Sequence, residues 1–341
     1  MSVPRICRRF LWLPLLPAVL LASCAGLQIQ FPEDPVAVLL AGGAEKPAAL
    51  AVFPPDFMVS LFAGDVFAQA AEESPQAAQM LDFLSDLFSR SDAVFAAFFS
   101  GGESGVSSCR ILASGNFPDM LLRFSMHSSD AWERAGSGAE SWYTGRFGSA
   151  GVGVALPNSD LLAAEIRFPD DGQAGNSETS AMRALLRALR ESPPADTVSP
   201  AVSGTFGFAV HSMNSRASGV PFSFFIPDLP VFFESAFADC ALPGAGEIAA
   251  SGLQLPLTTF GLYVSENPSP ETPPDGAYRL LIETEASSSR FALPAELFLR
   301  MAFPGQSVTR EDAHFFVETE ISREQAALAV LSMFLLPYMG M

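Results

Sequence analysis

The spacing of apolar residues changes several times along the chain, and each kind of spacing predicts a different element. Alternation and short continuous apolar runs are typical of strands, whereas apolar positions three and four apart are typical of helices. Strands are predicted at 48–53, 57–63, 94–99, 106–115, 161–168, 204–210, 258–266, 277–286 and 314–321, with more between 142 and 157. Helices are predicted at 65–89, 116–126, 177–190, 229–237 and 290–303, and a last one begins near Ser322.

Two of these helices carry recognisable start signals. Pro294 is placed to open the helix at 290–303, because proline is favoured in a first helical turn. Ser322 and Gln325 match a capping box. No charged residue follows Gln325, so we expect the last helix to pack as a core helix; docking in a membrane interface is the alternative.

The predicted elements repeat in two halves. A strand–turn–strand–helix unit ends with NFPDMLLRF in the first half and with ALPAELFLR in the second. Extended outward, each half gives the order β-α-β-β-α-β, which is that of a ferredoxin-like split βαβ unit. We therefore expect an α+β protein of two tandem related modules, each a mostly antiparallel sheet covered by helices. A ferredoxin-like fold (β-α-β-β-α-β) is one candidate for each module.

A Pro-rich linker and a distinct N-terminal segment set the predicted boundaries. Three prolines with Ser, Asp and Thr mark the linker. The expected divisions are a leader at 1–23, a tether at 24–35, module 1 at 36–191, a linker at 192–202 and module 2 at 203–341.

The leader has the three parts of a secretory signal peptide. Arg5, Arg8 and Arg9 precede an apolar run at 11–21, which is too short to span a bilayer, and small residues follow it. The end of the run, Leu21-Ala22-Ser23-Cys24, resembles the lipobox of bacterial lipoproteins. The alternative is an ordinary signal peptide that carries a cysteine by chance.

The resemblance to bacterial lipoproteins has consequences for Cys24 and for location. In that family the cysteine receives a diacylglyceryl group and becomes the first residue once the leader is removed. The partner implied is thus a membrane, held through lipid on Cys24. Ala25 stands where the family's best-known inner-membrane retention signal has Asp, which favours the outer membrane.

The charge of the chain excludes several partners. The formal net charge is −18; the leader holds three of the 19 basic residues and none of the 37 acidic ones, which leaves 16 − 37 = −21 for the remainder. Such a surface repels nucleic-acid phosphates and anionic headgroups. We expect no nucleic-acid binding, and any membrane anchor has to be the lipid.

No catalytic or cofactor motif is present in the sequence. A phosphate loop needs a lysine after its last glycine, and the only lysine is Lys46, in GGAEKP. One constellation could hold a divalent cation if alternation brings its carboxylates and imidazoles to one sheet face. Its members are His211, Glu283, Glu285, His314, Glu318 and Glu320. A solvated acidic sheet face is the commoner outcome for such a pattern.

Two further sets of residues allow alternative predictions. A Phe-rich region could line an apolar ligand site, although core packing is the commoner use of such residues. Its members are Phe222, Phe224, Phe225, Phe232 and Phe233. Cys109 and Cys240 could form a disulfide in an oxidising compartment or remain two separate buried thiols.

Together these patterns predict a lipid-anchored envelope protein that is not an enzyme. We expect a scaffold or binding module in envelope assembly or upkeep, which could bind another envelope protein. The alternative is a periplasmic carrier that holds a lipid or another apolar ligand in a Phe-rich interior. A scaffold should have a filled core and an exposed apolar patch, whereas a carrier should have a large apolar cavity.

Overall fold

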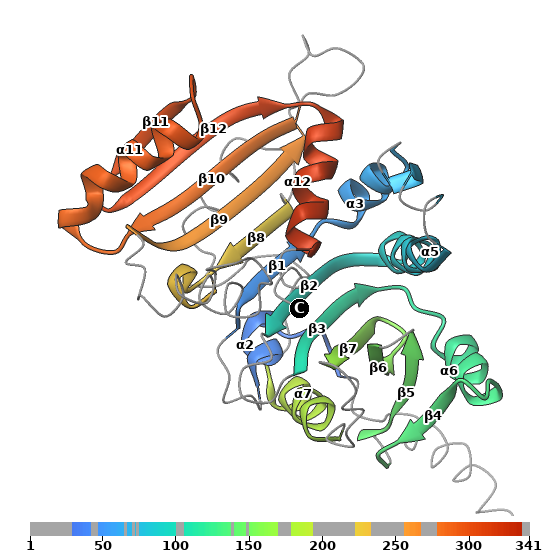
Figure 1. Ribbon diagram of the computed structural model, residues 1–341. Coiled ribbons are helices and arrows are strands. Elements are labelled where there is room, and N and C mark those ends of the chain that lie inside the picture. Colours follow the sequence, from blue (N-terminus) through green and yellow to red (C-terminus); the bar gives the residue numbers. More distant parts are fainter. Residues whose placement is uncertain are drawn as a thin grey trace, which may run out of the picture.

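One twelve-stranded antiparallel sheet runs through the described part of this computed structural model (Figure 1). The strand order is β11-β12-β10-β9-β8-β1-β2-β3-β7-β6-β5-β4. The structure describes residues 29–41, 47–64, 67–69, 72, 75–99, 106–137, 140–147, 150–169, 179–193, 222–232, 256–266 and 278–335.

The strands of the first half are β1 (Ala49–Phe53), β2 (Ser91–Phe99), β3 (Val106–Gly115), β4 (Trp132–Ala135), β5 (Trp142–Phe147), β6 (Ala150–Asn158) and β7 (Leu161–Pro169). Those of the second half are β8 (Phe222–Ile226), β9 (Leu257–Glu266), β10 (Tyr278–Ala286), β11 (Ser307–Glu311) and β12 (His314–Ile321). The helices are α2 (Pro35–Leu40), α3 (Pro55–Phe62), α5 (Pro75–Ser89), α6 (Asp119–Ser128), α7 (Thr179–Glu191), α11 (Ala292–Ala302) and α12 (Arg323–Leu335), with a 3₁₀ turn, η3, at Ser289–Phe291.

The two halves share this sheet, which differs from the expected pair of separate modules. Strand β8 pairs with β1 of the first half on one side and with β9 on the other. All described strand pairs are antiparallel. In a split βαβ unit another strand lies between the two strands that a helix joins. Strands β1 and β2, which are joined through α3 and α5, instead pair directly with each other, so the ferredoxin-like order is not found among the described strands. The coarser prediction, helices on a mostly antiparallel sheet, is confirmed.

Side chains alternate between the two faces of the sheet and feed two separate cores. On β2, Val94, Ala96 and Phe98 contribute to one core. Helices α3, α6, α11 and α12 supply residues to the same core. The residues between them, such as Phe95 and Ala97, join a core on the other face with α2 and α7. The strands of the centre are therefore apolar on both faces, as expected for a sheet covered by helices.

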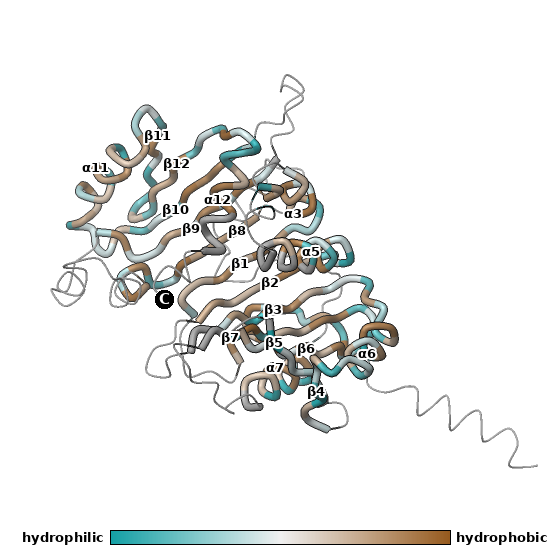
Figure 2. The backbone as a smooth tube through the Cα atoms, turned by 45° about the vertical axis from the view of Figure 1, so that its right-hand side comes forward, coloured by the Kyte–Doolittle hydropathy of each residue, from teal (hydrophilic) through white to brown (hydrophobic). Residues whose placement is uncertain are grey.

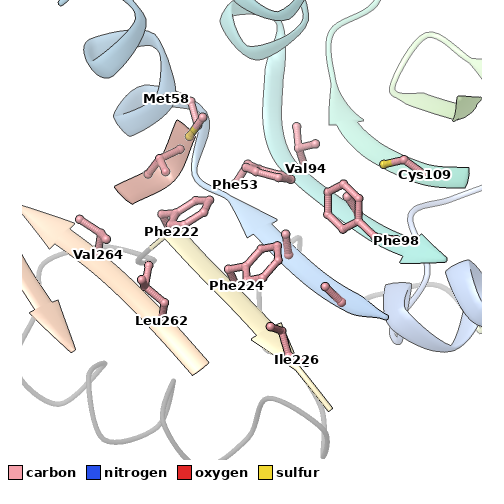
Figure 3. Packing of buried hydrophobic residues seen from close by; sticks show 14 of the residues in the cluster. Phe53, Met58, Val94, Phe98, Cys109, Phe222, Phe224, Ile226, Leu262 and Val264 are labelled. Atoms are coloured by element: carbon pink, nitrogen blue, oxygen red, sulfur yellow. The ribbon is translucent and has the colours of Figure 1, made fainter. Parts of the chain in front are cut away.

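Phenylalanines fill the join between the halves (Figure 3). The ring of Phe222 on β8 lies 5.6 Å from that of Phe53 on β1 and 6.5 Å from that of Phe57 on α3. The ring of Phe224 lies 6.1 Å from that of Phe98 on β2. Such contacts join elements that are distant in sequence, so the core is continuous across the predicted module boundary.

Several element predictions are confirmed and one is wrong. Strands β3 and β12 have the predicted bounds, and Ser322 and Gln325 form the capping box: Gln325 N donates to Ser322 Oγ and Ser322 N to Gln325 Oε1. The segment predicted as a strand at 57–63 belongs to α3. Proline in its first turn favours a helix start, and Phe57, Met58 and Leu61 are buried on one side of that helix.

Other predictions lie partly or wholly outside the described residues. The strand expected at 204–210 lies outside them, as does most of the linker at 192–202 and the second part of the helix at 229–237. The last helix packs as predicted in its described part, since Ala326, Ala327 and Val330 are buried in the core. Strands β4, β8 and β11 were not predicted.

Candidate functional site

Helix α6 presents an apolar surface to solvent at one end of the sheet. Met120, Leu121 and Phe124 are exposed at 80%, 70% and 71%. These positions are neighbours on one helix side, whereas Met126 on the other side is buried in the core. Figure 2 shows α6 at the margin of the molecule, with hydrophobic and hydrophilic residues along it. We call Met120, Leu121 and Phe124 the α6 face.

The sequence around α6 fixes the helix in this position. Pro118 stands at its N-cap, where its missing N–H costs nothing, and the backbone N–H of Met120 donates to Asp119 Oδ1 at 2.8 Å. Phe117, just before the helix, is 1% exposed and packs in the core. The helix also packs against β4 and β6, so the α6 face is held on a rigid support.

The first described residues are fixed to the turn between β6 and β7. The side-chain amide of Asn158 donates a hydrogen bond to the carbonyl oxygen of Ile29. Two residues later, the ring of Phe31 lies 5.8 Å from that of Phe95 on β2. Asp34 then caps α2, accepting from Ala37 N at 2.9 Å. The chain thus enters the fold along a defined path.

The same turn holds the start of α6. Phe117 N donates to Ser159 O at 2.6 Å, and Gly115 N donates to Asp160 O at 3.1 Å. From the helix itself, the Arg123 guanidinium donates to Leu156 O on β6. The β6–β7 turn therefore joins the beginning of the described chain to the α6 face.

The distance available between Cys24 and this turn is short. Five residue steps separate Cys24 from Ile29. At about 3.3–3.6 Å per residue, a fully extended chain of that length spans roughly 17 Å. A group attached to Cys24 is consequently confined to the neighbourhood of the β6–β7 turn.

A second exposed apolar surface lies on α11, beside the opposite edge of the sheet. Leu293, Leu297, Phe298 and Met301 are exposed at 64%, 53%, 50% and 75%. On the inner side of the same helix, Ala292, Ala295 and Leu299 are buried. Strand β11, beside α11, and strand β4, beside α6, are the two ends of the strand order. The two apolar surfaces are therefore separated by the width of the sheet (Figure 1).

The residues of the predicted cation site share a sheet face where the structure describes them. Glu283 and Glu285 lie opposite Phe316 and His314 in the β10–β12 register, which places their side chains on one face as alternation predicts. Glu318 also lies on this face, but Arg279 Nε contacts its Oε1 at 2.5 Å. Across the described residues no group of three or more possible metal ligands comes together. His211 lies outside the described part of the chain.

Glu283 forms a buried polar cluster instead. Tyr263 donates a hydrogen bond to Glu283 Oε2 at 3.3 Å, and His314 Nδ1 lies 3.8 Å from Oε1. Burial raises the pKa of Glu283, and neighbouring Glu285 adds to this, while His314 and Tyr263 act in the opposite direction. Burial and then the charge of Glu283 likewise raise the pKa of Tyr263. This cluster links three adjacent strands.

The phenylalanines predicted as an apolar ligand site are mostly core residues. Phe222, Phe224 and Phe232 are buried and belong to the main core. Phe225 points to the other sheet face, where it packs against the second core. Phe233 lies outside the described residues.

The structure describes one of the two cysteines for which a disulfide was an alternative. Cys109 on β3 is a free, buried thiol, and burial, with a further contribution from Glu165, raises its pKa far above the usual range. Cys240 lies outside the described residues.

Sequence reasoning predicted helix α6 but missed its exposed face. In DMLLRFSMHS, apolar residues occupy both sides of the helix: Met126 faces the core, while Met120 and Phe124 face solvent. A helix that is apolar around its circumference is ordinarily buried. Its place beside an edge of the sheet, which only the topology gives, exposes one side.

Comparisons with known proteins find solved structures of similar fold. No protein-family model and no curated protein matches the sequence. Among solved structures, crystal form III of TP0453 matches with a TM-score of 0.50 and 16% identity, covering 88% of this chain and 98% of that chain. Crystal form I of TP0453 matches with a TM-score of 0.49 and 16% identity, covering 88% and 97%. At this identity the likeness to form III concerns the fold alone.

Proposed function

We propose that this protein is a lipid-anchored, non-catalytic scaffold or binding module of the bacterial cell envelope. Cys24 carries the lipid, and the α6 face lies on the membrane surface beside it. The observation that carries the proposal is the β6–β7 turn, which binds both Ile29 and the segment that opens α6. An anchor within roughly 17 Å of that turn brings the bilayer to the α6 face.

The lipid on Cys24 and the α6 face bind the membrane with different strengths and therefore have different roles. Acyl chains on Cys24 supply the attachment, at about 0.8 kcal/mol per buried CH₂. Three side chains on α6 supply about 1.5–3 kcal/mol each when fully removed from water. The lower end of that range gives about 4.5 kcal/mol for the three side chains, which favours the docked orientation roughly two-thousandfold. The face thus orients a protein that the lipid already holds.

Charge limits the kind of membrane surface that fits. With a formal net charge of −18, the protein is repelled by anionic headgroups. Arg123 and His127 are the basic residues of α6 and Asp119 is its acidic one. A zwitterionic surface suits this composition best. Ala25 in place of the retention Asp favours the outer membrane, as the resemblance to lipoproteins implies.

A scaffold fits the described core better than a carrier. Two of the phenylalanines that could have lined a ligand site, Phe222 and Phe224 on β8, pack instead on Phe53 of β1 and Phe98 of β2. The exposed apolar side chains lie on α6 and α11, on the outside of the fold. A filled interior with apolar outer surfaces is what a module that binds other surfaces requires. Among the described helices, none is long and apolar enough to cross a bilayer.

The anchor and the face can be tested together in one labelling experiment. Phe124→Cys is made in the full chain with Cys7→Ser and Cys240→Ser, and Cys109 is buried. The lipidated protein is reconstituted in phosphatidylcholine vesicles and treated with a water-soluble maleimide. We expect Cys at 124 to react several-fold more slowly than in the same protein carrying Cys24→Ser, which should leave the membrane.

A matched control separates the two parts of the proposal. Thr309→Cys on β11 lies at the opposite sheet edge and is exposed, so its labelling rate should not depend on the anchor. Equal labelling rates at position 124 with and without the anchor would contradict the proposed docking of α6 on the membrane. If the Cys24→Ser protein stays in the membrane fraction, the proposed lipid anchor is wrong, whatever the labelling shows.

A further inference from the structure

Three exposed apolar residues of α11 form a row whose spacing stays the same when the helix is reversed end to end. Leu293, Leu297 and Met301 are four residues apart, so they form one row along the helix, centred on Leu297. The row lies opposite the buried Ala295 and Leu299, and it points straight away from the core. Turning the helix end to end exchanges Leu293 with Met301 and leaves Leu297 at the centre.

The flanks of this row carry groups that match when the helix is reversed. On one flank Glu296 and Arg300 form a salt bridge with 2.9 Å between Arg300 Nη2 and Glu296 Oε1. On the other flank Phe298 is half exposed. When two identical helices pack face to face in antiparallel orientation, each flank meets its own copy. In the register centred on Leu297, Glu296 of one copy is offset from Arg300 of the other by two residues, or about 3 Å of helix rise, which is within reach of the Arg300 side chain. The two Phe298 rings lie side by side with the same offset.

We propose that α11 binds α11 of a second copy of this protein, antiparallel and centred on Leu297. The contact is isologous, as in most homodimers. A crossing angle of about 20°, as in most helix bundles, keeps the two rows in contact along their length. Local charge is balanced across it, although each chain is acidic as a whole. A bilayer surface at α11 would bury the apolar row equally well, and it is the alternative that the crosslinking test distinguishes from a second copy.

The strength of this contact follows from its size. One helix of eleven residues per copy makes a small interface, at the low end of specific protein–protein contacts. Confinement of both copies to one membrane raises their effective concentration and compensates for this. The anchor raises the fraction of the protein that is paired, but it does not change how the two helices are oriented in the pair. A failure of the pairing is therefore distinct from a failure of the proposed anchor, which fractionation reports.

Cysteine crosslinking tests both the contact and its register. In the full chain with Cys240→Ser, expressed in bacterial cells, Leu297→Cys should give a disulfide dimer on oxidation of the membranes. Leu293→Cys alone and Met301→Cys alone should give little dimer, and cells that express both should give a crosslinked pair. Leu121→Cys on α6 is the control and should stay monomeric. A monomeric Leu297→Cys protein, or a crosslink to a chain of another mass, would overturn the proposal.

Charge exchange tests the antiparallel orientation independently. Glu296→Arg leaves two arginines on the flank and Arg300→Glu leaves two glutamates, so each variant repels its own copy. In the Leu297→Cys background we expect each variant alone to lose the dimer and the two co-expressed variants to regain it. Both single variants break the salt bridge within the helix, which therefore cannot explain a recovery on mixing. Equal dimer in all three samples would contradict the antiparallel pairing.

Discussion

The side-chain amide of Asn158 donates a hydrogen bond to the carbonyl oxygen of Ile29 and so fixes the first described residue to the β6–β7 turn. The next residues of that turn, Ser159 and Asp160, accept from Phe117 and Gly115 just before α6. A short stretch of structure thus couples the place where the chain enters the fold to an exposed apolar helix. The proposed orientation on a membrane follows from this coupling.

Loss of the Asn158 side chain should loosen the coupling without removing the anchor. Asn158→Ala removes the donor to Ile29, and a hydrogen bond of this kind contributes about 1 kcal/mol. We expect the variant to remain in the membrane fraction, while maleimide labelling of Cys at position 124 becomes faster than in the parent. Asn158→Asp, which cannot donate, should behave in the same way. Unchanged labelling in both variants would show that the tether does not direct α6.

Phe222 should behave as a core residue that joins the two halves. Its ring is buried between Phe53 and Phe57, and truncation of a buried Phe costs about 3–5 kcal/mol. Denaturant unfolding of Phe222→Ala should show a loss in that range, with a smaller loss for the half-buried Phe225→Ala.

The same residue tests the alternative carrier function by native mass spectrometry. The protein purified from cells should have no additional mass beyond its own lipid. An extra apolar ligand that is lost from Phe222→Ala, together with near wild-type stability of that variant, would favour the carrier.

The buried cluster at Glu283 predicts a pH dependence of stability. Because burial raises the pKa of Glu283 in the folded protein, its stabilising protonated form is fully present below the unfolded pKa near 4.5 and is lost as pH rises through the folded value. Glu283→Gln stays neutral and keeps an acceptor for Tyr263. The variant should match the parent in thermal unfolding at pH 4 and exceed it at pH 7.5. An equal difference at both values of pH would contradict the assignment.

The capping box at the start of α12 gives a prediction with a simple control. Ser322 Oγ accepts from Gln325 N at 3.2 Å, and replacement of such a cap by alanine costs about 1 kcal/mol. Ser322→Ala should lower the free energy of unfolding by that amount, whereas Ser322→Asn or Ser322→Asp should restore most of it. Identical unfolding curves for all variants would indicate that α12 is held by its buried face alone.

The sequence predicted local structure better than the arrangement of the strands. Alternation located β3 and β12 and placed Glu283 and Glu285 on one face, because these properties depend on neighbours in the chain. The pairing of β8 with β1 could not be predicted, since it joins residues that are distant in sequence and that any antiparallel partner would satisfy. The segment at 57–63 is an apolar run of the length of a strand, but Pro55 stands in the first turn of a helix, and α3 forms there.

The candidate site shows the same limit. The pattern around Cys24 and the helix at 116–126 were both predicted from the sequence. The link from Ile29 to that helix was not, because it depends on the hydrogen bonds of the β6–β7 turn. Exposure of the α6 face depends on its place beside the last strand of the sheet. Topology, rather than composition, turns an ordinary apolar helix into a surface that can bind.

Trp132 allows the most direct measurement of the orientation on a membrane. It begins β4, directly after α6, and packs over Gly145, whose added Cβ would lie 2.8 Å from the indole. Besides Trp12 of the leader, the other tryptophan is Trp142, which is fully buried. The lipidated protein in vesicles of acyl-chain-brominated phosphatidylcholine should show quenched Trp132 fluorescence. Trp132→Phe should abolish the quenching. Replacement of all three residues of the α6 face by serine (Met120→Ser, Leu121→Ser and Phe124→Ser together) should greatly reduce it. Equal fluorescence in brominated and ordinary vesicles would contradict the account.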